Sequence, residues 1–218
     1  MSFSSKLLDL IFPPKCAFCR CLLPDSSAGM CAACEKDLPR AAGSDIKQKI
    51  PFVSFVAAPL YYEGKVRQSL LRFKFGGCPG YADVYARILA DFLGTVPELD
   101  FDTVTWVPLS AKRLRGRGYD QARLIAEKTA ALLAVPCVPT LKKVRNVRAQ
   151  SATGSAEKRR ANISGAYAVP DRTAVAGKKL LLADDIVTTG ATLSECARML
   201  GMAGAARVIA AAVARRRD

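Results

Sequence analysis

The sequence contains no histidine, a single tryptophan, and no apolar run as long as the ~18 residues that a membrane span requires. Without an imidazole, catalysis or metal binding must use other side chains. The stretch Phe3–Phe12 carries Lys6 and Asp9 and lacks a small-residue cleavage site, so it makes a poor signal peptide. These absences predict a soluble, cytoplasmic protein without membrane insertion.

The hydrophobic content and the charge are both high. Half of the 218 residues are hydrophobic, which is enough for one α/β core and a small appendage. The formal net charge is +14, and residues 112–160 alone hold thirteen Lys or Arg against three acids. This concentration of positive charge attracts polyanions, either nucleic acid or a ligand rich in phosphates. The alternative interpretation is a solvated basic surface without a ligand.

Cysteines near the start form two C-x-x-C pairs, Cys16 with Cys19 and Cys31 with Cys34. Two such turns supply four thiolates for tetrahedral Zn²⁺, which predicts a closed, structural zinc site. Cys21 is a fifth sulfur that could replace Cys19 or stay free. Two disulfides would need an oxidising compartment, and a redox C-x-x-C would need a βαβ context, so both alternatives are disfavoured.

The order of elements predicts the fold class and the domains. Strand-like and helix-like segments alternate after a polar linker at 39–51, which favours a mostly parallel α/β sheet with flanking helices. We expect a zinc-finger-like four-cysteine module at 1–45 and one larger domain at 52–218. Strands are expected at 52–62, 101–109, 135–141, 166–169, 180–183 and 207–213, helices at 66–75, 82–93, 122–132 and 192–203, and irregular structure at 110–119 and 142–161. Asp120 should cap the helix that follows it.

The most informative segment is residues 180–193. An apolar strand is followed by Asp184 and Asp185, and then by the small, hydroxylated turn Thr188–Thr192 at the start of a helix. Backbone N–H groups and threonine hydroxyls at a helix start can hold a phosphate, while the carboxylates accept hydrogen bonds from ribose hydroxyls. Thr192 and Glu195 have the spacing of a capping box. The order of these groups predicts a site for ribose 5-phosphate.

This segment resembles the phosphoribosyl diphosphate (PRPP) signature of type I phosphoribosyltransferases. Residues 106–122 and 148–162, together with the four-cysteine start, are similar to the ComF/GntX family. The resemblance implies a type I phosphoribosyltransferase-like fold with an N-terminal zinc finger. It also implies a role in natural competence, in which such proteins assist the uptake of transforming DNA.

The resemblance also implies roles for individual residues. Asp184 and Asp185 would hold the ribose hydroxyls, and Mg²⁺ would arrive with the diphosphate. The 5′-phosphate would contact Thr188, Thr189, Gly190, Ala191 and Thr192. Candidates for the pyrophosphate site and a closing loop are Ser110, Lys112, Arg113, Arg115, Arg117, Arg148, Gln150, Arg159 and Arg160. Tyr119-Asp120 and Ala149 depart from the family pattern.

Two functional hypotheses follow. In the first, the chain is a ComF-like protein that binds PRPP and assists DNA uptake, with single-stranded DNA and competence proteins such as a DNA-uptake helicase as partners. In the second, it is an active phosphoribosyltransferase of nucleotide or nucleobase metabolism with an unknown acceptor. The chain shows no glutaminase segment and no nucleobase-recognition element, which disfavours an amidophosphoribosyltransferase. A vestigial pocket is disfavoured by the intact acidic pair.

Overall fold

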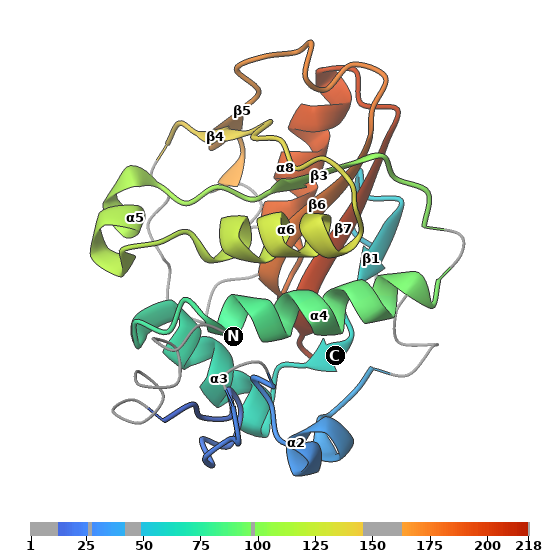
Figure 1. Cartoon of the computed structure of the whole chain (residues 1–218). Coiled ribbons are helices and arrows are strands. Elements are labelled where there is room, and N and C mark those ends of the chain that lie inside the picture. Colours follow the sequence, from blue (N-terminus) through green and yellow to red (C-terminus); the bar gives the residue numbers. More distant parts are fainter. Residues whose placement is uncertain (1–12, 26–27, 42–48, 97–98, 146–162, 218) are drawn as a thin grey trace.

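A computed structural model describes residues 13–25, 28–41, 49–96, 99–145 and 163–217. Its main sheet has the strand order β1-β7-β6-β3, with β2 also paired to β7, and all of these pairs are parallel. The strands are β1 (Phe55–Ala57), β2 (Leu60–Tyr61), β3 (Thr103–Trp106), β6 (Lys179–Val187) and β7 (Arg207–Arg215). A separate antiparallel ribbon joins β4 (Lys142–Lys143) to β5 (Tyr167–Ala168) (Figure 1). The predicted parallel α/β fold is confirmed.

The two central strands are apolar because both faces of the sheet are covered. Along β6, Leu181 and Ala183 belong to one buried cluster, while Leu180 and Leu182 belong to the other. The same alternation runs along β7, because successive side chains of a strand point to opposite faces. Each face needs its own layer of helices, and an unbroken apolar run is the sequence signature of such a strand.

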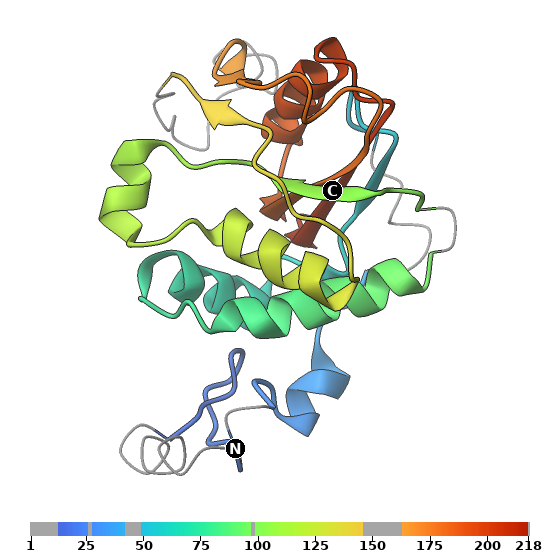
Figure 2. The ribbon, with the colours of Figure 1, turned by 45° about the horizontal axis from the view of Figure 1, so that its top comes forward.

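The helices divide between the two faces. Those that share the first buried cluster are α3 (Gly64–Phe75), α4 (Tyr81–Gly94) and α6 (Gln121–Leu132). The helix α8 (Ala191–Met202) packs on the opposite face with β5 (Figure 2). The short helix α5 (Ala111–Arg117) projects from the domain and buries no residue. None of the helices in the described part of the chain combines the length and the apolar character that a membrane span needs.

The cysteine-rich segment lies against the helices rather than apart from them. It contains a one-residue bridge between Lys15 and Leu22 and the helix α2 (Ala32–Asp37). Its buried residues Cys16, Phe18 and Cys34 belong to the same hydrophobic cluster as α3 and α4. The segment therefore shares a core with the larger domain.

Most of the predicted elements are found, with bounds that differ by a few residues. The strand predicted at 135–141 is wrong, because only Cys137 bridges to Val104 there. Pro136 and Pro139 flank this bridge, and a proline has no N–H to continue a ladder. The loop predicted at 110–119 is also wrong, since most of it forms α5, which Ser110 caps by accepting a hydrogen bond from the Arg113 N–H.

Candidate functional site

The acidic pair lies where β6 extends beyond its neighbour β3. The last pair between these strands joins Trp106 to Ala183, whereas β6 continues alongside β7 as far as Val187. Asp184 and Asp185 therefore lie inside a nine-residue strand, rather than after the shorter strand that we predicted. Because β3 has already ended, no strand in the described part of the chain pairs with β6 on that side at the two acids. This gap is at the carboxyl edge of the sheet, where parallel α/β folds bind ligands.

The turn after the acidic pair leads directly into α8. Gly190 is the N-cap residue, in the left-handed region at φ 69°, and no side chain among the described residues caps the helix. A Cβ at this position would lie 2.4 Å from Ile50 Cδ1, so the turn requires glycine. The predicted capping box is wrong: Thr192 lies inside the helix, and Glu195 accepts a hydrogen bond from the Gly165 N–H. The first-turn N–H groups of α8 therefore face the site without a side-chain cap.

The two carboxylates differ in their surroundings. Asp185 forms an ion pair with Lys74 Nζ at 2.8 Å, and its backbone N–H donates to Asp184 Oδ1 at 2.8 Å. Burial, followed by repulsion from Asp185, raises the pKa of Asp184 to about 8. Sequence reasoning missed Lys74, because it comes from α3 and lies more than 100 residues before its partner in the chain.

A pocket of about 160 Å³ opens beside the pair. Its second wall comes from the β4–β5 ribbon, where Lys143 Nζ donates to Tyr167 Oη at 2.9 Å. Burial, and then the nearby charge of Arg113, lowers the pKa of Lys143. Gln121 also lines the pocket, and its buried Nε2 donates to no acceptor among the described residues. An unpaired buried donor beside several cations suits an anionic ligand.

The predicted basic residues on α5 fall into two groups, those that line the pocket and those that do not. Arg113 and Arg117 line the pocket, whereas Lys112 and Arg115 are exposed and do not line it. Ser110 is buried as the N-cap of α5. Of the predicted phosphate turn, Thr192 lines the pocket, Ala191 is buried and Thr188 is exposed. Four further predicted residues lie outside the described part of the chain: Arg148, Gln150, Arg159 and Arg160.

Asp120 was predicted to cap α6, and it does so by accepting a hydrogen bond from the Arg123 N–H. Its second oxygen accepts from the Leu109 N–H at 2.9 Å. This carboxylate therefore holds the chain on both sides of α5. Burial raises the pKa of Asp120. The departure from the family pattern at this position thus has a structural role.

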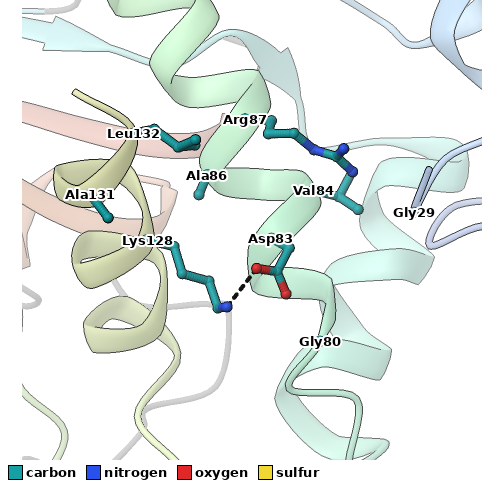
Figure 3. A pocket seen from close by; sticks show the side chains of 9 residues that line it. All are labelled: Gly29, Gly80, Asp83, Val84, Ala86, Arg87, Lys128, Ala131 and Leu132. Carbon is teal, nitrogen blue, oxygen red and sulfur yellow. Dashed lines mark hydrogen bonds and ion pairs between the residues drawn. The ribbon is translucent and has the colours of Figure 1, made fainter. Parts of the chain in front are cut away.

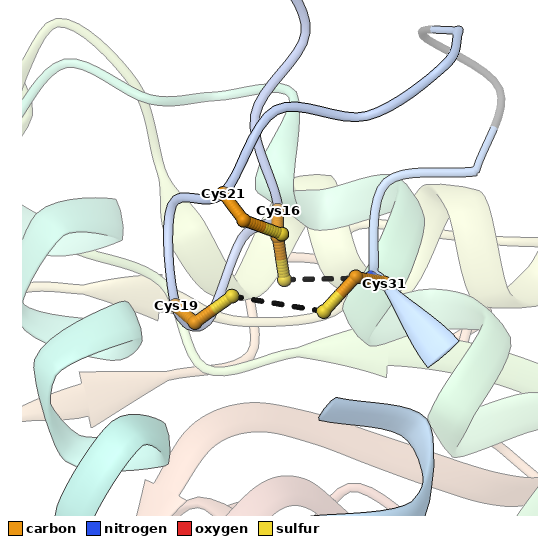
Figure 4. A group of neighbouring side chains, drawn as sticks. All are labelled: Cys16, Cys19, Cys21 and Cys31. Carbon is orange, nitrogen blue, oxygen red and sulfur yellow. Dashed lines mark hydrogen bonds between the residues drawn. The ribbon is translucent and has the colours of Figure 1, made fainter. Parts of the chain in front are cut away.

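The cysteines form one compact group. The Sγ atoms of Cys16, Cys19, Cys21 and Cys31 all lie within 4.8 Å of one another (Figure 4). The thiol of Cys34 is the fifth member: burial raises its pKa, and so do its hydrogen bonds with Cys19, Cys31 and Cys16. The backbone N–H of Cys21 lowers the pKa of the Cys19 thiol to about 6. Both cysteine pairs and Cys21 thus meet at one point.

The geometry of this group fits a metal ion. Two thiolates on a tetrahedral zinc ion are about 3.8 Å apart, because each Zn–S bond is about 2.3 Å. The Sγ atoms of Cys19 and Cys31 are 3.6 Å apart. Cys21 completes the compact set of four with Cys16, Cys19 and Cys31, whereas the predicted ligand Cys34 is not in that set. The cluster is therefore compatible with metal binding through sulfur alone.

A larger cavity, of about 660 Å³, lies away from the acidic pair. Figure 3 shows it between α4 and α6, beside Gly29 of the cysteine-rich segment. Lys128 and Asp83 form an ion pair across it, and Ala131 and Leu132 add apolar surface. Its third charged residue, Arg87, donates to the Ala28 oxygen, so the chemistry of this cavity does not match that of the predicted phosphate site.

An all-parallel sheet with an acidic pair and an uncapped helix start at its carboxyl edge defines a phosphoribosyltransferase-type domain. Residues 120–218 match the phosphoribosyl transferase domain family. The fold class predicted from the sequence is thereby confirmed.

The chain is also similar to curated proteins. It is 26% identical over 212 residues to competence protein F of Haemophilus influenzae, covering 87% of this chain and 92% of that protein. It is 33% identical to DNA utilization protein YhgH of Salmonella typhi, covering 49% of this chain and 46% of that protein. It is 32% identical to competence protein ComFC of Bacillus subtilis, covering 64% and 55%. The last two matches span about half of those relatives. The predicted resemblance is confirmed: the chain is similar to competence proteins of the ComF type.

Proposed function

We propose that this protein binds PRPP and acts in the cytoplasm to assist DNA uptake in natural transformation. The observation that carries the proposal is that Asp184 and Asp185 on β6 are followed directly by the uncapped first turn of α8. The names of the related competence proteins support the link to DNA. Both halves of the proposal are testable separately.

The proposed binding mode assigns each group a role. Asp184 and Asp185 accept hydrogen bonds from the ribose hydroxyls, and the turn Thr188–Thr192 holds the 5′-phosphate. The diphosphate lies toward Arg113 and Arg117, with Gln121 as a further donor. Mg²⁺ would be carried by the diphosphate, whose charge it would offset.

The proposed DNA surface is the outer side of α5 and its neighbour Phe75. The side chains of Lys112, Arg113 and Arg115 are exposed, and α5 contains no acid. Phe75 is 70% exposed, and the Arg117 guanidinium lies 5.0 Å from its ring centroid. Cations beside an exposed ring suit the phosphates and bases of a single strand. Competence proteins, including a DNA-uptake helicase, are the proposed protein partners.

The cysteine cluster is proposed to hold structural Zn²⁺, with residues 1–45 as the metal module and 52–218 as the phosphoribosyltransferase-like domain. The four sulfur ligands would leave no open position for a reacting water. Zinc would supply folding energy to a segment with little core of its own.

A second candidate function is phosphoribosyl transfer to an unknown acceptor of nucleotide or nucleobase metabolism. Lys143 and Tyr167 favour it, because they line the same pocket as the acidic pair. Their polar groups would contact an acceptor bound beside the ribose. Release of pyrophosphate in the presence of a defined acceptor would identify this activity.

The first test is a calorimetric titration of PRPP with Mg²⁺ into the zinc-loaded protein. We expect binding that the double variant Asp184→Ala/Asp185→Ala abolishes, because the ribose hydroxyls lose both acceptors. The matched control is Asp100→Ala/Asp171→Ala, which removes two exposed carboxylates remote from the pocket. An absence of binding to the folded wild-type protein would refute the proposal.

A further inference from the structure

The helix α3 lies between the cysteine cluster and the acidic pocket. Its apolar side chains Val66, Leu70 and Phe73 are fully buried in the core that the cysteine-rich segment shares. Two of its charged residues, Arg72 and Lys74, are neither exposed nor part of that apolar stripe. Because successive residues turn by about 100°, side chains two positions apart point to nearly opposite sides of a helix. Arg72 and Lys74 can therefore contact different parts of the molecule.

Arg72 contacts the first C-x-x-C turn. Its guanidinium donates to the backbone oxygens of Ala17 at 2.9 Å and Phe18 at 2.8 Å. These are the two residues between Cys16 and Cys19. The Arg72 Nε is buried and donates to no acceptor among the described residues, so the guanidinium is held by those two carbonyls. Its contact with the turn depends on the backbone shape between the two cysteines.

A second set of contacts fixes the same turn. Ser69 Oγ donates to the Ala17 oxygen at 2.6 Å and lies 2.6 Å from Tyr85 Oη. Phe18 is 1% exposed and packs edge-to-face on Tyr85, with the ring centroids 6.1 Å apart. The turn is thus joined to α3 and α4 by both polar and aromatic contacts. Movement of this turn would be transmitted to α3.

At the other side of α3, Lys74 reaches the acidic pair. Its Nζ lies 2.8 Å from Asp185 Oδ1, and the two side chains are 18% and 11% exposed. Both residues line the pocket. A mostly buried ion pair of this kind depends strongly on the position of its partners, because little water is present to compensate for a displacement. Lys74 therefore constrains the orientation of the Asp185 carboxylate.

We infer that the cysteine cluster controls the affinity of the acidic pocket through α3, with Arg72 and Lys74 as positioning residues. The inference rests on the proposed function, since it assigns the pocket a ligand. Metal binding would fix the spacing of Cys16 and Cys19, and with it the Ala17 and Phe18 carbonyls that hold Arg72. Loss of the metal would release this turn, loosen α3 and displace Lys74 from Asp185.

The test compares zinc-loaded wild-type protein with Arg72→Met, Lys74→Met and the control Arg67→Met, an exposed position on the same helix. PRPP affinity is measured by calorimetry, and zinc content by metal analysis. We expect Arg72→Met and Lys74→Met to weaken PRPP binding roughly 5- to 100-fold, the usual range of coupling between sites, with zinc retained. Arg67→Met should bind as the wild type does.

A second arm removes zinc from each folded protein with a chelator. Zinc removal should weaken PRPP binding to the wild type by a similar factor, and should have little further effect in Arg72→Met, where the connection is already broken. Equal losses on zinc removal in both proteins would overturn the inference. So would unchanged PRPP affinity of the folded, zinc-free wild type.

Hydrogen exchange separates this inference from the proposed function. Zinc removal should increase amide exchange in residues 64–75 more than in residues 191–202, whether or not PRPP binds. If the wild type binds no PRPP but shows this pattern, the proposed ligand is wrong and the coupling through α3 holds. If exchange in α3 does not change, the coupling is wrong.

Discussion

At the scale of single residues, the turn before α8 depends on the absence of a side chain at Gly190. A Gly190→Ala substitution introduces a Cβ at φ 69° and places it against Ile50. The left-handed conformation alone costs roughly 1–2 kcal/mol, and relief of the contact must move Ile50 or the turn. We expect a lower unfolding temperature and at least about tenfold weaker PRPP binding, since the phosphate-binding amides move with the turn. Thermal unfolding and calorimetry measure both.

The matched control for that substitution is Gly177→Ala. Gly177 has φ 72°, but a Cβ there would meet no atom within 4 Å. It should lose stability through backbone strain alone and keep its PRPP affinity. Adding Ile50→Ala to Gly190→Ala should restore part of the stability. If the two glycine variants behave alike, the contact with Ile50 has no role.

The raised pKa of Asp184 predicts a pH dependence of stability. In the unfolded chain this carboxyl titrates near 3.8, whereas in the folded protein its pKa is about 8. The folded state therefore binds the additional proton, and its stability falls as pH rises between these values. Asp184→Asn removes this loss, so the variant should gain on the order of 1–3 kcal/mol over the wild type at pH 8, with little difference near pH 4. Chemical denaturation at both pH values measures the gain.

The control for this pH series is Asp100→Asn, an exposed acid paired with Lys179. The difference in free energy of unfolding between this variant and the wild type should not increase with pH. The Asp184→Asn variant should also bind PRPP more weakly, because an amide donates where the ribose requires an acceptor. A gain of equal size at pH 4 and pH 8 would contradict the assignment of this pKa.

Some residues of the site could be predicted from the sequence and others could not. Asp184 and Asp185 were predictable because the strand, the acids and the helix start are contiguous in the chain. Lys74, Lys143 and Tyr167 reach the same pocket from distant segments, and only the packing of α3 and the β4–β5 ribbon brings them there. No local pattern marks such residues.

At the scale of elements, α5 is capped by Ser110 and has no buried residue. Its exposed cations predict salt-dependent binding of single-stranded DNA. The variant Lys112→Gln/Arg115→Gln removes two charges outside the pocket, so the slope of log affinity against log salt should become shallower by about 1.4. Binding to labelled single strands across a salt series measures this slope. The control is Lys65→Gln/Lys178→Gln, two exposed lysines outside α5, and an equal change there would refute a role for α5.

Element prediction failed where local and long-range effects compete. Residues 110–117 lack apolar periodicity because α5 has no buried residue, and periodicity reports only on a buried face. The capping box failed because Glu195 pairs with Arg198 and with the Gly165 N–H, a partner thirty residues away. The strand β6 was predicted too short, since polar acids are not expected inside a strand whose pairing with β7 continues beyond them.

At the scale of the whole molecule, the cysteine-rich segment and the sheet domain share a core, so they should unfold together. Phe18→Ala leaves a cavity where that segment meets α4, which costs about 3–5 kcal/mol and lowers the unfolding temperature by roughly 10 °C. Unfolding should still show a single transition, because the two parts share a core. Calorimetry and the fluorescence of Trp106, which lies on β3, both follow this transition. The control Phe52→Ala removes an exposed ring and should have little effect. Two separate transitions would indicate independent domains.

The central strand of the sheet comes late in the chain. β7 pairs with β6 on one side and with β1 and β2 on the other, so it joins the two halves of the sheet. During synthesis, β1, β2, β3 and β6 leave the ribosome before the strand that connects them exists. Until residues 207–215 emerge, the apolar faces of these strands stay uncovered and open to aggregation. We therefore expect a nascent chain of this protein to be most prone to aggregation until β7 has been synthesised.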